Sequence, residues 1–183
     1  MGGVAVEMDG AGKCLTVRPG SLKDSEMLWR FCKEQTWEEF QAWGADFVYE
    51  YPPEKEQMKN SLAQRMETGF WFLKICLDEI PVGFAEIIMV KHEPEKGILS
   101  RLLLDPAYRG NGLGKLAVKA ILDYGFGNLP LKEIWLIVYK ENRRARKCYE
   151  ACGFQVQNSL IRPGRPEAVE MSAKAPPFSK RAD

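Results

Sequence analysis

The sequence predicts an α/β domain in which helices are layered on a central sheet, an α+β arrangement. Three observations support this fold class. Apolar runs that suit strands alternate along the chain with segments whose apolar residues recur at helical spacing. A length of 183 residues is enough to bury one hydrophobic core. Because no internal repeat or low-complexity tract divides the chain, we expect one domain over residues 1–175 and a disordered tail over 176–183.

The first half of the chain predicts a strand, three helices and a hairpin. Pro19-Gly20 ends the first strand, and Ser21 is a capping residue for the first helix. Thr36 with Glu39 three positions later is the capping-box pattern that starts a second helix, which Tyr51-Pro52-Pro53 interrupts. The expected elements are a strand at 13–18, helices at 22–33, from 36 and at 54–67, and strands at 70–77 and 82–90.

The second half predicts further strands and two more helices. Leu116, Ala120 and Tyr124 recur at helical spacing after a glycine-rich turn. Pro163-Gly164-Arg165-Pro166 is a turn sequence that joins a closing hairpin. The expected elements are a strand at 97–104, a helix at 115–126, a strand at 133–139, a helix after residue 142, and paired strands at 154–161 and 168–173.

Residues 105–114, Asp-Pro-Ala-Tyr-Arg-Gly-Asn-Gly-Leu-Gly, lie between an expected strand and an expected helix. A helix start leaves backbone N–H groups without partners and carries about half a unit of positive charge. Glycines at 110, 112 and 114 let a phosphate approach those groups, and Arg109 adds a cation beside them. The pattern predicts an anion-binding cradle, with a ligand-free turn and helix cap as the alternative.

Two familiar phosphate-binding motifs fit this turn poorly. The dinucleotide fingerprint requires a carboxylate about 20 residues further on, at the end of the next strand, and Glu141 lies too far along. The phosphate loop of nucleotide hydrolases ends in Gly-Lys-Ser or Gly-Lys-Thr, which does not occur here.

The composition excludes several classes of partner. The 26 basic and 25 acidic residues leave a net charge of +1, so no general field attracts nucleic acid or a membrane surface. No apolar run reaches the roughly 20 residues that span a bilayer, and we expect a cytoplasmic protein. Five scattered cysteines and one histidine lack zinc spacing, so we expect reduced thiols and no metal.

A second motif follows the strand at 133–139. Residues 142–154 read Asn-Arg-Arg-Ala-Arg-Lys-Cys-Tyr-Glu-Ala-Cys-Gly-Phe. The Arg-x-x-Gly-x-Gly turn, the strand, and then Asn, Ala, Tyr and Gly-Phe at this spacing resemble the GNAT superfamily of N-acetyltransferases, which use acetyl-coenzyme A. The resemblance covers residues 81–155. Within it, Asp105-Pro106-Ala107-Tyr108 and the helix ending Asp123-Tyr124-Gly125-Phe126 look like the branch of ribosomal-protein N-terminal acetyltransferases.

The resemblance implies a mostly antiparallel sheet of about seven strands, flanked by about four to five helices. The sheet is expected to splay apart between the strands that end near Leu104 and Tyr139, and the pantetheine arm is expected to lie in that gap. The basic residues within 143–147 have two possible interpretations. They form a solvated helix face, or they lie near the coenzyme phosphates as the resemblance implies. The residues expected to bind acetyl-coenzyme A are Leu102, Leu103, Leu104, Arg109, Gly110, Asn111, Gly112, Leu113, Gly114, Lys115, Asn142, Ala145 and Tyr149.

Tyr149 is the expected catalytic acid. A phenol with a pKa of about 10 stays protonated beside a thiol leaving group of about 8.5. It also stands where the resembled family has a tyrosine, although a ring packed on the sheet is the alternative. In the resembled family, backbone N–H groups of the strand before the glycine turn stabilise the oxyanion, which implies this role for residues 102–104 here. Cys148 is not expected to face the same thioester, because successive helix residues point about 100° apart.

Glu86 is the expected base, because the Glu that many members of the resembled family have on the strand at 99–103 is missing here, and Glu86 lies one strand earlier. Alternation places it on the face of Phe84 and Ile88, where apolar surroundings would raise its pKa. The alternative for Glu86 is a carboxylate that faces solvent or pairs with Arg101. In that case a chain of waters would act as the base.

The segment 34–56 combines seven carboxylates with six aromatic residues and one lysine, which suits a cationic amine. An aromatic core with a solvated acidic face is the alternative. The residues expected to bind the acceptor are Trp37, Tyr49, Glu50 and Glu86.

The expected reaction is transfer of an acetyl group from acetyl-coenzyme A to a primary amine of a small molecule or a peptide N-terminus. The amine attacks directly, without a covalent acyl-enzyme. Nucleic acid and membrane are not expected partners, and a homodimer is left open. Two alternatives remain: a module that senses acyl-coenzyme A without turnover, and an acyltransferase with a longer donor such as succinyl-coenzyme A.

Overall fold

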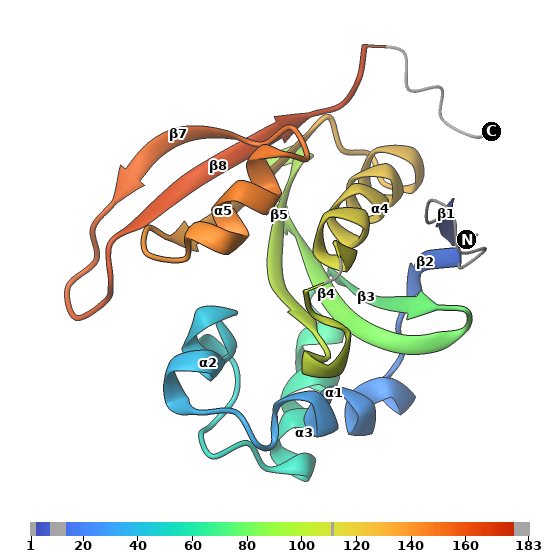
Figure 1. The fold of residues 1–183 in the computed structure, drawn as a ribbon, viewed down its shortest axis with the longest axis vertical. Helices are drawn as coiled ribbons and strands as arrows, with labels where there is room; N and C mark the ends of the chain where they lie inside the picture. Colours follow the sequence, from blue (N-terminus) through green and yellow to red (C-terminus); the bar gives the residue numbers. More distant parts are fainter. Residues whose placement is uncertain (1–2, 8–13, 111, 178–183) are drawn as a thin grey trace.

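The structure is a computed structural model that describes residues 3–7, 14–110 and 112–177. Eight strands form one sheet in the order β1-β2-β3-β4-β5-β6-β8-β7, with helices on both faces (Figure 1). The strands are β1 (Val4–Glu7), β2 (Cys14–Pro19), β3 (Phe70–Leu77), β4 (Ile80–Val90), β5 (Glu93–Leu104), β6 (Glu133–Tyr139), β7 (Gln155–Leu160) and β8 (Ala168–Lys174). The helices are α1 (Ser25–Cys32), α2 (Trp37–Ala42), α3 (Lys55–Met66), α4 (Leu113–Asn128) and α5 (Arg143–Glu150), with short turns η1 (Leu22–Asp24), η2 (Ala45–Phe47) and η3 (Pro106–Tyr108).

The expected fold class is confirmed, with one strand more than expected. That strand, β1, pairs antiparallel with β2, as Val4 opposite Val17 shows. The expected capping box is also confirmed, because the N–H of Glu39 donates to Thr36 Oγ1 (3.3 Å) and the N–H of Thr36 donates to Glu39 Oε2 (3.0 Å). The expected tail at 176–183 falls mostly outside the described residues.

Strands β5 and β6 form the only parallel pair in the sheet of described residues. They pair over three positions, Lys96–Ile98 with Glu133–Trp135, and then separate. On its other edge β5 stays paired with β4 as far as Leu104, opposite Gly83. The expected splay is therefore present, and it leaves one edge of β5 without a neighbouring strand beyond Ile98.

Alternation in β3 and β4 divides the core between the two faces of the sheet. Leu73 and Ile87 face α4, and Phe72 and Phe84 face α1, α2 and α3. The rings of Phe72 and Phe84 stack 5.2 Å apart, which closes the second face under the three N-terminal helices. The two separate cores hold β5 firmly from both sides while its outer edge stays open.

Substitution of Gly83 tests how tightly β4 approaches β5. A Cβ at Gly83 would lie 2.7 Å from the backbone oxygen of Leu103 and 2.6 Å from Leu104 Cδ2. We expect Gly83→Ala to lower the free energy of unfolding by about 1–3 kcal/mol in urea titrations. In the matched control Gly127→Ala, within α4, the Cβ meets nothing within 4 Å. That variant is expected to gain about 0.5–1 kcal/mol, and equal effects of the two would contradict the close approach.

Candidate functional site

A cavity of about 770 Å³ occupies the space where β5 and β6 separate. Its walls come from the free edge of β5, the end of β6, the start of α4 and one side of α5. Two segments cover its other end, namely the stretch from α2 to η2 and the loop between β7 and β8, which reaches toward α2 (Figure 1). The predicted coenzyme-binding residues that line it are Leu102, Leu103, Leu104, Arg109, Gly110, Gly112, Gly114, Lys115, Asn142, Ala145 and Tyr149.

Two of the predicted coenzyme-binding residues need separate mention. Leu113 is buried in the core below the cavity and does not line it. Asn111 lies outside the described residues. Beyond Ile98, the remaining residues of β5 as far as Leu104 line the cavity from the edge that β6 has left. Backbone polar groups of this edge are therefore available to a ligand rather than to a neighbouring strand.

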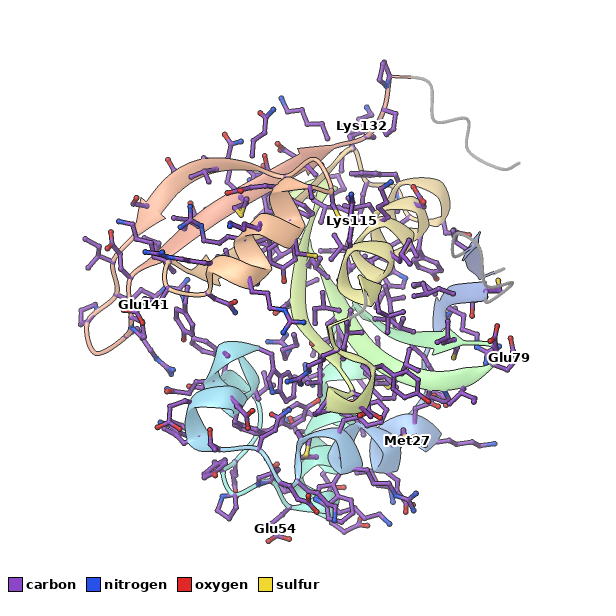
Figure 2. All side chains as sticks on the ribbon, in the orientation of Figure 1. Met27, Glu54, Glu79, Lys115, Lys132 and Glu141 are labelled. Carbon is purple, nitrogen blue, oxygen red and sulfur yellow. The ribbon has the colours of Figure 1, made fainter. Side chains whose placement is uncertain are left out.

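The start of α4 has the geometry of an anion cradle. Gly110 has φ +104° and Gly112, the residue that caps α4, has φ +77°, a region that favours glycine. A Cβ at either position would meet no protein atom within 4 Å, so the backbone borders open space. Arg109 stands beside the turn, with its Nε donating to the carbonyl of Leu104 (2.9 Å). Lys115 follows, on the side of α4 that faces α5 (Figure 2).

Asn142 joins the end of β6 to α5. The backbone N–H of Ala145 donates to Asn142 Oδ1 (3.1 Å), so the side chain caps the helix. Asn142 also lines the cavity. Capping and ligand contact are compatible at this position.

Tyr149 lines the cavity from α5, and its ring meets Phe154 edge-on, with centroids 5.6 Å apart. Burial raises the pKa of its hydroxyl well above the ordinary value, with smaller contributions from the thiols of Cys148 and Cys152. Tyr149 therefore keeps its proton at neutral pH. The expected packing of the ring against the core is confirmed, and because the residue also borders the cavity, its role as the catalytic acid stays a prediction.

Cys148 lines the same cavity as Tyr149. The cavity extends along the side of α5, so both residues border it, and the expectation that they do not face one thioester stays a prediction. A hydrogen bond from Cys152 lowers the pKa of Cys148 to about 7, opposed by burial and assisted by the charges of Lys115 and Arg144. The pKa of Cys152 is raised in turn, mainly by the same hydrogen bond.

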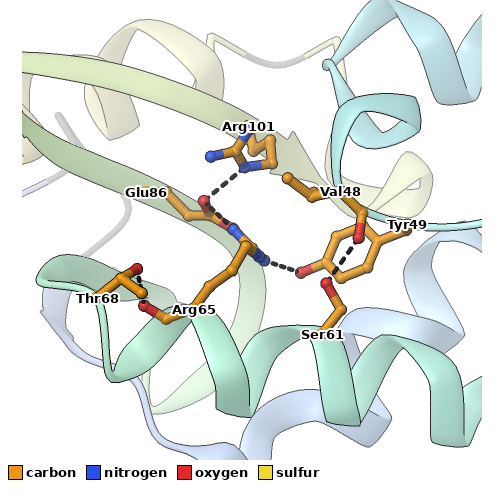
Figure 3. Close-up of polar contacts among 7 residues, drawn as sticks. All are labelled: Val48, Tyr49, Ser61, Arg65, Thr68, Glu86 and Arg101. Carbon is orange, nitrogen blue, oxygen red and sulfur yellow. Dashed lines mark hydrogen bonds and ion pairs between the residues drawn. The ribbon is translucent and has the colours of Figure 1, made fainter.

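Glu86 does not line the cavity, and its surroundings are not apolar as expected. It is 2 % exposed, and its Oε2 accepts hydrogen bonds from Arg65 Nη1 (2.7 Å) and Arg101 Nε (2.5 Å) (Figure 3). Arg65 Nη2 also donates to the hydroxyl of Tyr49 (2.7 Å). The expected face of the strand is right, but the carboxylate is held between two guanidinium groups. This geometry corrects the assignment of Glu86 as a general base.

None of the four residues expected to bind the acceptor lines the cavity, although other residues of the same segment do. Tyr49 is 5 % exposed and packs in the core, whereas Trp37 and Glu50 lie at the surface. The left-handed Gly44 turns the chain after α2, and this places the next side chains against the cavity. The residues of this segment that line it are Glu39, Gln41, Ala42, Trp43, Gly44 and Phe47. Helical spacing identified the core side of α2 and gave no signal for the turn.

The loop between β7 and β8 is tied to this segment by an ion pair of Arg165 with Asp46, whose side chain is 3 % exposed. The guanidinium of Arg165 also lies over the ring of Phe47, 4.6 Å from its centroid. Two distant parts of the sequence thus meet over the cavity. No site residue is expected in this loop from the sequence, because its turn residues indicate only a hairpin.

Other site types receive no support from the described residues. None of the helices within 3–7, 14–110 and 112–177 combines the length and apolar content needed to cross a membrane. In the same part of the chain, no three His, Cys, Asp or Glu side chains gather as a metal site requires.

Comparison with known proteins gives a family match and several relatives. The model of the acetyltransferase (GNAT) family matches residues 29–154. The spermidine N(1)-acetyltransferase of Escherichia coli (strain K12) is 35 % identical over 79 residues, which cover 43 % of this chain and 42 % of the relative. The chain thus matches less than half the length of that relative. The aminoglycoside N(6′)-acetyltransferase type 1 of Klebsiella pneumoniae is 25 % identical over 123 residues, covering 62 % and 60 %.

The fold is also similar to solved structures. A crystal structure of the aminoglycoside acetyltransferase AAC(6′)-Ib with coenzyme A and kanamycin has a TM-score of 0.73 at 20 % identity, and covers 87 % of this chain and 94 % of that one. The narrower resemblance to ribosomal-protein N-terminal acetyltransferases finds no support in these relatives, which are spermidine and aminoglycoside acetyltransferases.

The lowered pKa of Cys148 predicts its reactivity. The thiolate is the nucleophile, so alkylation of Cys148 by iodoacetamide should rise with pH, reach half its maximum near pH 7 and level off above it. Burial raises the pKa of Cys32 to about 12, so that thiol should stay unmodified in the folded protein. Peptide mass spectrometry over a pH series measures both sites. In Cys148→Ser the phase near pH 7 should disappear, and a midpoint close to 9 for Cys148 would contradict its thiolate character.

Proposed function

Because the chain belongs to the acetyltransferase (GNAT) family, we propose that it transfers an acetyl group from acetyl-coenzyme A to a primary amine of a small molecule or a peptide N-terminus. The observation that carries the proposal is the continuous cavity from the start of α4 to the free edge of β5. One end of it offers backbone N–H groups and cations, and the other end is bordered by side chains suited to a second substrate. Such a cavity accommodates a donor and an acceptor together.

The start of α4 is proposed to bind the coenzyme phosphates. Gly110 and Gly112 leave the backbone open on the cavity side, and the dipole of a helix of 16 residues favours an anion there. Four cationic side chains line this end, namely Arg109, Lys115, Arg144 and Lys147. The basic run at the start of α5 is thus partly a phosphate-facing group in this proposal and partly a solvated face.

The free edge of β5 is proposed to stabilise the oxyanion of the tetrahedral intermediate. Backbone N–H groups aimed at a developing oxyanion contribute about 3 kcal/mol per donor. Residues Leu102, Leu103 and Leu104 line the cavity on the edge from which β6 has separated. Acetyl-coenzyme A, when bound, supplies the thioester, and the residues of β5 orient its carbonyl.

Tyr149 is proposed to donate the proton that the departing thiolate needs, because its pKa lies well above that of a thiol. The acceptor amine attacks the thioester directly in this proposal, so Cys148 forms no bond to the acyl group. No side chain is assigned as the base, since the carboxylate of Glu86 is held by Arg65 and Arg101. Waters in the cavity can accept the amine proton.

Substitution of Tyr149 tests the acid. We expect Tyr149→Phe to lower kcat by about a hundredfold or more in an assay of thiol release from acetyl-coenzyme A, because the phenol is lost while the ring contact with Phe154 is kept. The control Cys148→Ala should retain activity, and its complete loss would instead favour an acyl-enzyme. If acetyl-coenzyme A raises the melting temperature of the protein, but no amine causes release of the coenzyme A thiol, the alternative of a sensor module would be favoured.

Substitution of Gly112 tests the cradle independently of turnover. Its φ of +77° strains an L-residue by about 1–2 kcal/mol, and the new Cβ of Gly112→Ala would enter the space proposed for a phosphate. We expect coenzyme A to bind about tenfold more weakly in titration calorimetry. Gly153→Ala is the matched control, because Gly153 also has a positive φ of +95° and open space at its Cβ. Equal affinities of the two variants would contradict the phosphate site.

A further inference from the structure

A buried cluster of three ionised side chains beside the cavity has an incomplete charge balance. Arg65 and Arg101 share the single carboxylate of Glu86, and the three side chains are 18 %, 9 % and 3 % exposed respectively. Tyr49, which accepts from Arg65, adds no charge because burial raises the pKa of its hydroxyl. The cluster therefore carries a net charge of one positive unit. An uncompensated charge at such depth is unfavourable, and an anion from outside would stabilise it.

Arg101 is the residue that connects the unmatched charge with the cavity. This residue has a left-handed backbone, with φ +50°, where β5 bulges opposite β4. Its Nε is fixed on Glu86, and its two Nη groups have no hydrogen-bond partner within the described part of the chain (Figure 3). Arg101 also lines the cavity. A nearly buried guanidinium is thus fixed at one nitrogen, keeps two donor groups without a partner among the described residues, and belongs to a residue that borders the cavity.

The rest of the cavity adds further positive charge. Its basic lining residues are Arg101, Arg109, Lys115, Arg144, Lys147, Arg162 and Arg165, and among described residues its only acidic one is Glu39. The carboxylate of Glu39 already accepts from the backbone N–H of Thr36. Asp46, near the same end, is paired with Arg165. Arg109, Lys115, Arg144 and Lys147 are the side chains proposed for the coenzyme phosphates, and Arg165 is paired with Asp46. The charges that remain on these walls are Arg101, Arg162 and Glu39, a positive sum that disfavours a polycationic acceptor.

We propose that the acceptor amine carries its own anionic group, a carboxylate or a phosphate, which binds the Nη groups of Arg101. The inference rests on the proposed acetyl transfer and names the acceptor class of that same site. A planar guanidinium pairs with two oxyanion oxygens at once, so Arg101 would orient the acceptor as well as attract it. The bound anion also completes the charge of the cluster formed by Arg65, Glu86 and Arg101. Amino acids are the simplest compounds of this class.

A panel of matched acceptors tests the class. Thiol release from acetyl-coenzyme A is measured with tyrosine and tyramine, with lysine and cadaverine, with O-phosphoethanolamine and ethanolamine, and with spermidine and kanamycin. We expect kcat/KM of the anionic member to exceed that of its partner by about tenfold or more in at least one pair, as a charged hydrogen bond implies. The first two pairs report a carboxylate and the third a phosphate.

Each other result of the panel overturns the inference. Preference for spermidine or kanamycin, or equal turnover within every pair, would exclude an anionic acceptor while the proposed acetyl transfer stands. Absence of thiol release with every amine would contradict the proposed function itself, and the inference would fall with it.

Substitution of Arg101 tests the residue. The measured quantity is the ratio of kcat/KM for the anionic acceptor to kcat/KM for its uncharged partner, which cancels any loss of folded protein. We expect Arg101→Gln to lower this ratio about tenfold or more, mainly through the KM of the anionic acceptor, and Arg101→Lys to restore part of it. Arg30→Gln, at an exposed position of α1, is the control with the same change of charge and should keep the ratio. If Arg101→Gln lowers both members of a pair equally, Arg101 only supports the structure and the inference fails.

Discussion

The site depends on the short parallel pairing of β5 and β6. Three positions of each strand meet, and beyond Ile98 the two strands separate. This arrangement leaves backbone polar groups of β5 without a strand partner, a cost that a sheet avoids unless something else binds there. The strand keeps its place because β4 pairs with its other edge and because hydrophobic cores pack on both faces of the sheet. The open edge is thus rigid, and a rigid edge can aim N–H groups at a reacting atom.

Local signals predicted the parts of the structure that are fixed by neighbouring residues. Strand β3 and strand β6 match their expected bounds, and the capping box of Thr36 forms as expected. The glycine turn was also recognised, because positive φ at Gly110 and Gly112 follows from residue type and spacing. Strand β1 was not predicted, because four residues are too few to show a hydrophobic alternation, and its pairing with β2 depends on the tertiary fold.

The site residues that were predicted incorrectly depend on contacts across the fold. Alternation placed Glu86 on the correct face, but two arginines from other elements, Arg65 and Arg101, decide its role. Arg101 was expected only as a possible partner of Glu86, because an arginine within a strand gives no local indication of a left-handed bulge. Trp43 reaches the cavity only because the chain reverses at Gly44 after α2. Sequence periodicity describes which side of an element is buried, whereas a cavity forms between elements.

The likeness to spermidine and aminoglycoside acetyltransferases bears differently on the two ends of the cavity. The family match over residues 29–154 includes the glycine turn and α5, which we propose to bind the donor, and also α2 and Arg101. It stops before the loop between β7 and β8, so Arg162 and Arg165, which also line the cavity, lie outside the match. A family can keep its donor site while the charge around its acceptor changes, since part of the proposed acceptor end is built by this separate loop. The charges of this chain, rather than the names of its relatives, therefore give the stronger argument about the acceptor.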